Sequence, residues 1–243
     1  VQDELVYAPD LKGLYYGEKS KLIVEPDKQR QRTNFKLTGK LNSKHLMTLL
    51  PESLKDPVKG RSHWDILVSH DNKSNPQTPL LEMNASSNLS GTELAYPLPF
   101  KIESNQNRPL IFYAEISDQL MLDFDLKLKD VFDSSGKLDL SSNESNRLYF
   151  LDVNFGTDTV TQKLSKSKPI AGIGMNGDIS SINVDHWFDY YDRHFSGNSR
   201  DSINPLRQMS LVHLDIEKLT FSGQQALKSE FTVFNNNEQL YGS

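Results

Sequence analysis

The sequence of 243 residues contains no cysteine, which excludes disulfides, thiolate metal sites and a cysteine nucleophile. A complete lack of thiols also favours an oxidising compartment such as a bacterial periplasm. Positive charge is in deficit, with 27 Lys and Arg against 32 Asp and Glu and a formal net charge of -5. Since the sequence has no basic stripe, it predicts no nucleic-acid partner.

Long hydrophobic runs are also missing, and no stretch reaches the length of a membrane-spanning helix. The first residues, Val1 to Glu4, lack the basic and apolar regions of a signal peptide, so we expect any targeting segment to lie outside this chain. The mean hydropathy of -0.56 is low for a large globular protein. Many strands must therefore bury only one face.

The stretch from Leu120 to Lys129 shows this one-sided pattern most clearly. Apolar side chains occupy every second position up to Leu128, and from Asp123 onward every residue between them is charged. Side chains in a strand alternate between two faces, so the sequence predicts a β-strand with one apolar and one mostly charged face. The pattern alone fits either an outer strand of a sandwich or a strand whose apolar face meets lipid.

Similar alternation recurs in residues 110–116, 149–155 and 212–216, with turn residues between the runs. Residues 133–136 (Asp-Ser-Ser-Gly) predict one such turn. Strands and turns at short intervals are typical of an antiparallel meander. We therefore predict a mainly β fold, an elongated, curved antiparallel sheet that is groove-like or sandwich-like, with two short amphipathic helices.

The first of these helices is predicted after residue 42. Apolar residues follow one another there at helical spacing, and Ser43 is a suitable N-cap. Pro51 ends the pattern, because proline cannot continue a helix. These limits predict about two turns of helix.

The second helix is predicted near residue 185, where Asp185 lies close to the N-terminal end. Its apolar positions recur at i, i+3, i+4 and i+7: Val184, Trp187, Phe188 and Tyr191. A divalent cation would have to use His186 with Asp189 on the polar side. A solvated polar face is the usual property of a surface helix, and we predict no metal site.

Polar clusters elsewhere do not predict an enzyme. His63 and Asp65 would share one strand face with nothing converging on them. Asp123 and Asp125 have a spacing compatible with glycoside hydrolysis, but lysines continue their row as on a solvated strand face. The GxGxxG sequence of residues 172–177 opens no βαβ unit and predicts no dinucleotide loop. We predict no catalytic residue, no metal ion and no cofactor.

An ordered set of passages resembles the YhdP branch of the AsmA-like family and covers about half of the chain. The passages are Leu49-Leu50-Pro51 with Gly60 to Val68, Leu89 to Lys101 with Arg108-Pro109-Leu110, Gly177 to Trp187, and Leu211 to Gly223. The first three resemble, in order, the family's L-L-P … G-x-x-x-W, L-x-G-x-x-L-x-L-P-x-P-x-x-K … P-L and G-x-L-x-x-L-D-L-x-x-W passages. The last resembles the strand that follows them.

The sequence departs from the family pattern at three positions. Tyr96 stands where the family tends to have Leu, Lys101 comes one residue early, and Asn183 replaces the usual Asp. The family's amino-terminal membrane anchor is absent and family chains are far longer, so we expect an internal or carboxy-terminal fragment. The resemblance implies a periplasmic, β-rich bridge between inner and outer membranes, tethered to the inner membrane through a segment outside this chain.

The resemblance also implies an apolar groove that conducts phospholipid, with no catalytic residues. The lipid-groove candidates are apolar residues of the predicted strands: Phe112, Leu120, Leu122, Phe124, Leu126, Leu128, Leu151, Val153, Leu214 and Ile216. Expected partners are phospholipid acyl chains and components of both membranes. The alternative is a carbohydrate- or protein-binding β-sandwich of a secreted or surface protein. In that case four aromatic residues would form a stacking platform: Trp64, Trp187, Tyr190 and Tyr191.

Two places share a plan in which a strand containing glycine leads into a short helix, once after Gly39 and once after Gly177. Such a recurrence is typical of repeat proteins. We therefore predict that residues 1–243 are one β-rich segment of a longer repeat-like protein, divisible into sub-units 1–130 and 131–243.

Overall fold

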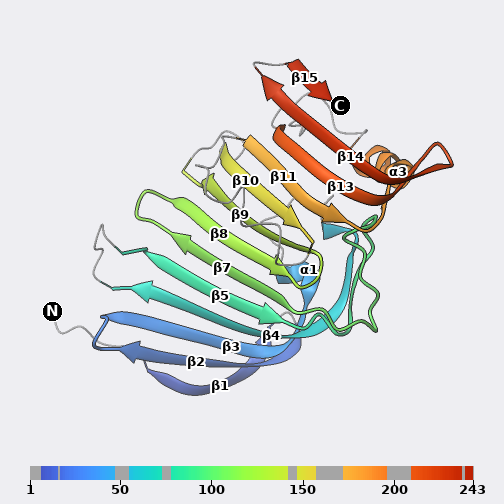
Figure 1. Cartoon of the computed structure of the whole chain (residues 1–243). Coiled ribbons are helices and arrows are strands. Elements are labelled where there is room, and N and C mark those ends of the chain that lie inside the picture. The colour runs from blue at the N-terminus through green and yellow to red at the C-terminus, as the bar shows by residue number, and fades with distance from the viewer. Residues whose placement is uncertain are drawn as a thin grey trace.

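The computed structural model describes residues 7–15, 17–46, 55–72, 78–141, 147–156, 172–195, 209–236 and 239–242. These residues form a curved, unclosed sheet of 15 strands (Figure 1). Two described helices, α1 (Ser43–Leu46) and α3 (Val184–Phe195), lie at one end of the strands, with α3 on the right in Figure 1. The predicted mainly β, curved and largely antiparallel fold is confirmed.

The strands follow the chain closely, so most neighbours in the sequence are neighbours in the sheet. The first part of the order is β1 (Ala8–Tyr15), β2 (Glu18–Asp27), β3 (Arg32–Asn42), β4 (Val58–Asp71), β5 (Leu81–Ser87), β7 (Leu110–Ile116) and β8 (Met121–Leu128). It continues with β9 (Phe132–Asp139), β10 (Arg147–Phe155), β11 (Gly172–Ile179), β13 (Met209–Phe221), β14 (Gln224–Asn236) and β15 (Gln239–Gly242). Two short strands lie beside this path, β6 (Thr92–Leu94) on β4 and β12 (Ile182–Asn183) on β13.

One part of the sheet differs from the predicted meander. Strand β10 pairs with β11, and β11 with β13, in parallel. Parallel neighbours need a connection that returns across the sheet, and α3 lies in the connection from β11 to β13. This is a βαβ arrangement that the sequence did not lead us to expect. The GxGxxG residues 172–177 nevertheless lie inside β11 rather than in a turn that opens a helix.

The predicted turn at residues 133–136 is wrong, because these residues lie inside β9. The chain reverses just before them, where Asp130 has a φ of 60°. Ser134 is buried, and Gly136 lies beneath the ring of Phe124 on the neighbouring strand. Small residues are needed here for packing rather than for a turn.

The pairing register separates the two faces of the sheet, because directly paired residues point to the same side. One face is apolar over most of the strands, and we call it the apolar face. A row across it runs through Leu22, Leu37, Ile66, Ala85, Phe112, Leu126, Ser134, Val153, Met175, Val212 and Val233. The opposite, polar face carries ion pairs such as Lys137 with Asp123 and Lys127 with Asp133.

The apolar face is covered at one end by the segment of residues 88–109, which connects β5 to β7. Leu89 and Ile102 of this covering segment are 2% and 0% exposed and pack in a core with Leu41, Trp64 and Leu128. A second core at the same end contains Phe155, Ile179, Val212, Leu214 and Ile216. Phe100 packs against both cores, so the covering segment joins them.

Glycine allows the tightest approach at this covered end. Gly60 has a φ of 92°, and a Cβ atom there would lie 2.1 Å from the carbonyl oxygen of Gly91. Gly177 has a φ of 115°, and its Cβ would lie 2.1 Å from the carbonyl oxygen of Phe155. No other residue fits such positions without moving the backbone.

Candidate functional site

The register places the predicted groove residues on the apolar face, with Leu120 as the exception. Leu120 lies in the turn before β8 with a φ of 59° and is 44% exposed. The other candidates all point to the same side of the sheet: Phe112, Leu122, Phe124, Leu126, Leu128, Leu151, Val153, Leu214 and Ile216.

Exposure divides these residues into two groups. Leu128, Leu214 and Ile216 are 3%, 7% and 5% exposed and belong to the two cores under the covering segment. The rest are half-buried. Phe112 and Val153 pack against the two cores, and the others belong to neither core: Leu122, Phe124, Leu126 and Leu151. The apolar face therefore has one end that the covering segment buries and another part whose side chains remain partly exposed.

The apolar face includes more residues than the candidates predicted from the sequence. Val68, Met83, Leu138 and Met175 are also half-buried and lie on the same side. The alternation of apolar residues in their own strands was the signal that could have identified them.

Helix α3 holds the covering segment in place through aromatic contacts. Trp187 donates a hydrogen bond from Nε1 to the carbonyl oxygen of Leu98 at 2.9 Å, and its ring lies 5.9 Å from that of Phe100. The rings of Tyr190 and Tyr96 are also 5.9 Å apart. Burial, together with the nearby Tyr190, raises the pKa of Tyr96 far above its usual value and keeps its hydroxyl protonated.

The predicted apolar side of this helix is only partly right. Phe188 and Tyr191 are 58% and 44% exposed, whereas Tyr190 is buried. Trp64 is also buried, in the first core. The four aromatic residues of the alternative prediction therefore do not form a common exposed stacking platform.

A cluster of hydroxyl groups lies buried where α1 meets the sheet. The Oγ of Ser43 is 2.6 Å from Oγ1 of Thr92, and the Oγ of Ser62 lies within 3.3 Å of Ser43, Ser87 and Thr92. Ser43 is therefore not the predicted N-cap, and Asn42 takes that role by accepting a hydrogen bond from the backbone N–H of Lys44. The rest of the predicted first helix, residues 47–50, lies outside the described residues.

In the described residues, the polar clusters identified in the sequence do not converge on one site. His63 and Asp65 are exposed on the polar face with 3.8 Å between Nε2 and Oδ2, and Asp123 is paired with Lys137. Asp185 accepts hydrogen bonds from the backbone N–H groups of Ser222 and Gly223, which fastens the start of α3 to the β13–β14 turn. No group of three His, Asp or Glu side chains suited to a metal ion occurs among the described residues.

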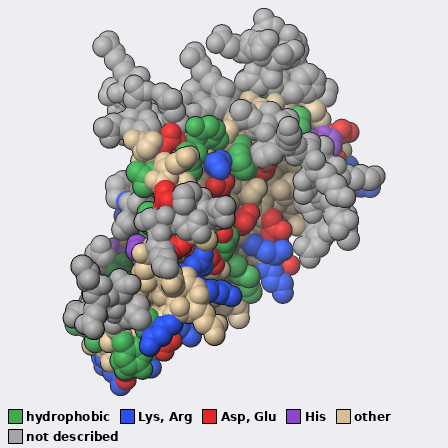
Figure 2. Space-filling model, turned by 90° about the vertical axis from the view of Figure 1, so that its left-hand side faces the viewer, with side chains coloured by type: hydrophobic (Ala, Val, Ile, Leu, Met, Phe, Trp, Pro, Cys, Tyr) green, Lys and Arg blue, Asp and Glu red, His purple; other side chains and the backbone are tan. Residues whose placement is uncertain are grey.

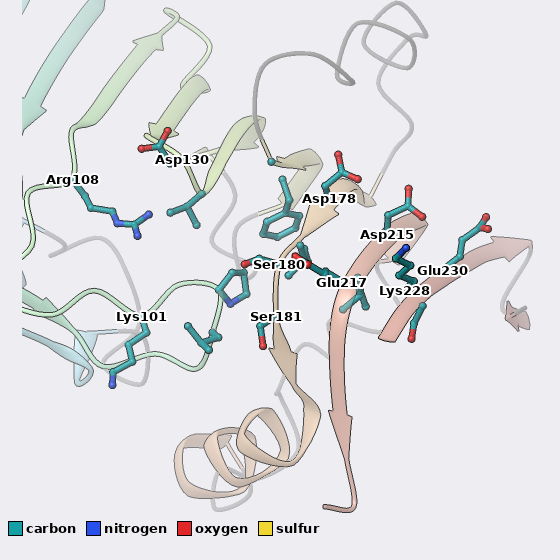
Figure 3. Close-up of a pocket in the computed structure, with 18 residues that line it drawn as sticks. Lys101, Arg108, Asp130, Asp178, Ser180, Ser181, Asp215, Glu217, Lys228 and Glu230 are labelled. Carbon is teal, nitrogen blue, oxygen red and sulfur yellow. The ribbon is translucent and has the colours of Figure 1, made fainter. Parts of the chain in front are cut away.

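A notch of about 730 Å³ lies beside the covered end (Figure 3). Strand β10 ends at Phe155, which is level with Gly177 of β11 and Leu214 of β13. Beyond this level β11, β13 and β14 continue, and their residues form one wall of the notch: Asp178, Ile179, Asp215, Ile216, Glu217, Lys228, Ser229 and Glu230. The other side is lined by Leu98, Pro99, Lys101, Arg108, Asp130 and Val131. The sequence did not predict this site, because the place where β10 ends relative to β11 and β13 depends on how the strands pair.

The family model described as YhdP protein matches residues 2–242. The chain belongs to the YhdP protein family. No curated protein and no solved structure matches the chain.

The YhdP family is a lipid-transport family of the cell envelope and is not known for enzymatic activity. The passages that resemble this family largely build the covered end, since Gly60, Gly91, Phe100 and Trp187 all lie there. Within the described residues, no helix is long and apolar enough to cross a membrane.

Proposed function

We propose that this chain is a non-enzymatic segment of an envelope lipid-transfer protein, and that its apolar face carries phospholipid acyl chains. The protein would act in the periplasm between the inner and outer membranes, tethered to the inner membrane through a segment outside this chain. Membership of the YhdP family supports the transport role.

The observation that carries the proposal is the half-buried part of the apolar face. Large side chains from consecutive strands lie side by side there, with Phe112 and Phe124 at a ring distance of 6.4 Å. Each CH₂ group that leaves water is stabilised by about 0.8 kcal/mol, so a continuous apolar surface holds acyl chains without specific polar contacts.

The single layer of the sheet favours this function over the β-sandwich alternative. A sandwich fills the space between two sheets with the side chains of both inner faces. In the described residues every long strand belongs to one sheet path, so no second sheet packs on the apolar face. Neither sign of charge dominates the side of the molecule in Figure 2, where acidic and basic side chains are intermixed.

The test is lipid binding by the purified protein and by two charge variants. Phe124→Asp places a carboxylate on the apolar face, and Asn84→Asp places one on the exposed polar face. We expect lipid, measured by mass spectrometry of organic extracts, to co-purify with the wild type and with Asn84→Asp but not with Phe124→Asp. Thermal melts establish that both variants are folded.

Two results would contradict the proposal. The first is a wild-type protein without enriched lipid. The second is a Phe124→Asp variant that retains lipid at the wild-type level while its fold is intact. A loss of folding in Phe124→Asp alone would place Phe124 in an ordinary core, and Leu126→Asp then repeats the test.

A further inference from the structure

We propose that the notch beside the covered end binds a zwitterionic headgroup that contains one phosphate and one primary ammonium group. This inference rests on the proposed lipid function and assigns a headgroup class to it. The notch lies at the end of β10 and reaches both faces of the sheet. Ile179 and Ile216 of the second core line it on the apolar side, and Asp178, Asp215 and Glu230, which alternate with them along the strands, line it on the polar side.

Arg108 is the cation on the other side of the notch, which Asp130 also lines. Its guanidinium group extends into the notch from the side of the covering segment (Figure 3). Within the described part of the chain, Arg108 has no ion-pair partner, and its backbone N–H is fixed to the carbonyl oxygen of Asn88 at 2.8 Å. A guanidinium group presents several donors in one plane and matches the oxygens of a phosphate.

The opposite wall is acidic. Asp178, Asp215, Glu217 and Glu230 come from three adjacent strands, and Lys228 is the cation among them (Figure 3). Asp178, Asp215 and Glu217 form no ion pair with another described residue. Such a wall attracts an ammonium group and repels a headgroup that carries only negative charge.

The two walls together select for a ligand with both charges. A wholly anionic headgroup would contact Arg108 but would also face the carboxylates. A purely cationic ligand would leave Arg108 without a partner. A phosphoethanolamine-type headgroup meets both requirements, and the volume of about 730 Å³ is within the usual range for small-molecule sites.

The experiment compares two short-chain phospholipids with identical acyl chains and different headgroups, phosphoethanolamine and phosphoglycerol, below their micellar concentrations. We expect the wild-type protein to bind the phosphoethanolamine lipid about three- to fivefold more tightly, as for partly exposed ion pairs. Arg108→Gln should weaken both lipids, because both contain the phosphate. The double variant Asp215→Asn/Glu217→Gln should remove the preference.

Matched controls exist on the same protein. Lys101 lines the notch, but its Nζ points away in Figure 3 and pairs with Glu103 at 2.6 Å. Lys101→Gln should therefore leave both affinities unchanged. Asp125 is exposed on the polar face away from the notch, and Asp125→Asn should also have no effect.

The outcomes separate this inference from the lipid function on which it rests. Equal wild-type affinities for the two lipids, both lost in Phe124→Asp, would overturn the headgroup site and leave the lipid function standing. Binding of free O-phosphoethanolamine in an Arg108-dependent manner, with neither lipid bound, would keep the site and overturn the lipid function. Binding of tetralysine alone, lost in Asp215→Asn/Glu217→Gln, would mark a surface for a basic protein and overturn the assignment.

Discussion

The ring of Phe124 lies directly over Gly136 of the neighbouring strand, and a Cβ atom on Gly136 would come within 2.5 Å of the ring carbon Cζ. Gly136→Ala should therefore push this ring out of the apolar face. We expect a loss of about 1–3 kcal/mol in the free energy of unfolding, as for other overpacked sites. Chemical denaturation measures the loss. The double variant Gly136→Ala/Phe124→Leu should recover part of it, and strictly additive effects would show that the two residues do not contact each other.

Gly177 should tolerate no side chain. Its positive φ and its distance to the carbonyl oxygen of Phe155 predict that Gly177→Ala lowers stability by about 3 kcal/mol or more. Gly13 is the matched control, since nothing lies within 4 Å of an added Cβ there. Thermal melts of both variants check this, and equal melting temperatures would contradict the close approach of β10 and β11.

The buried hydroxyl cluster should depend on Thr92. Thr92→Val keeps the shape of the side chain but leaves Ser43 and Ser62 without one hydrogen-bond partner. Such a loss costs about 1–3 kcal/mol in a buried site. Thr38→Val removes an exposed hydrogen bond to Asp65 and should change stability by about 0.5 kcal/mol or less. Denaturant titration of the two variants measures the difference, and similar values would mean that the cluster contributes no stability.

Trp187 should fasten the covering segment to α3. Trp187→Phe loses the hydrogen bond to Leu98, so we expect faster amide hydrogen exchange in residues 94–102 with little change in the strands. Phe188→Ala changes an exposed ring on the same helix and should leave this exchange unaltered. Mass spectrometry of peptides after exchange tests both. Unchanged exchange in Trp187→Phe would show that the core contacts of Phe100 and Ile102 hold the segment without the helix.

The strands and their faces were predictable where the chain alternates without interruption. Leu122, Phe124, Leu126 and Leu128 lie on one side as expected, because alternation is a local property of extended backbone. The sequence could not place Leu120 outside the strand, because an apolar residue type does not indicate a turn in which the backbone has a φ of 59°.

Features that depend on distant residues were not predictable. On α3, the helical pattern predicted an apolar side that includes Phe188 and Tyr191. The contacts with residues 96–100 instead bury Tyr190 and leave Phe188 and Tyr191 exposed. The same holds for the notch, which exists because β10 ends level with Gly177 and Leu214 while β11 and β13 continue to Ile179 and Phe221. Pairing between strands far apart in sequence is set by packing, and a single sequence does not reveal its register.

The covering segment limits the directions in which a ligand could move on the apolar face. Both of its ends continue into adjacent strands, β5 and β7, and its middle is buried in two cores, so it cannot swing aside as a hinged flap does. A ligand that moved parallel to a strand on the apolar face would contact the covering segment. The row of half-buried side chains beside the cores runs crosswise, from Val68 and Met83 through Phe124 to Leu151. For the proposed carrier of acyl chains, the open direction therefore lies across the strands rather than along them.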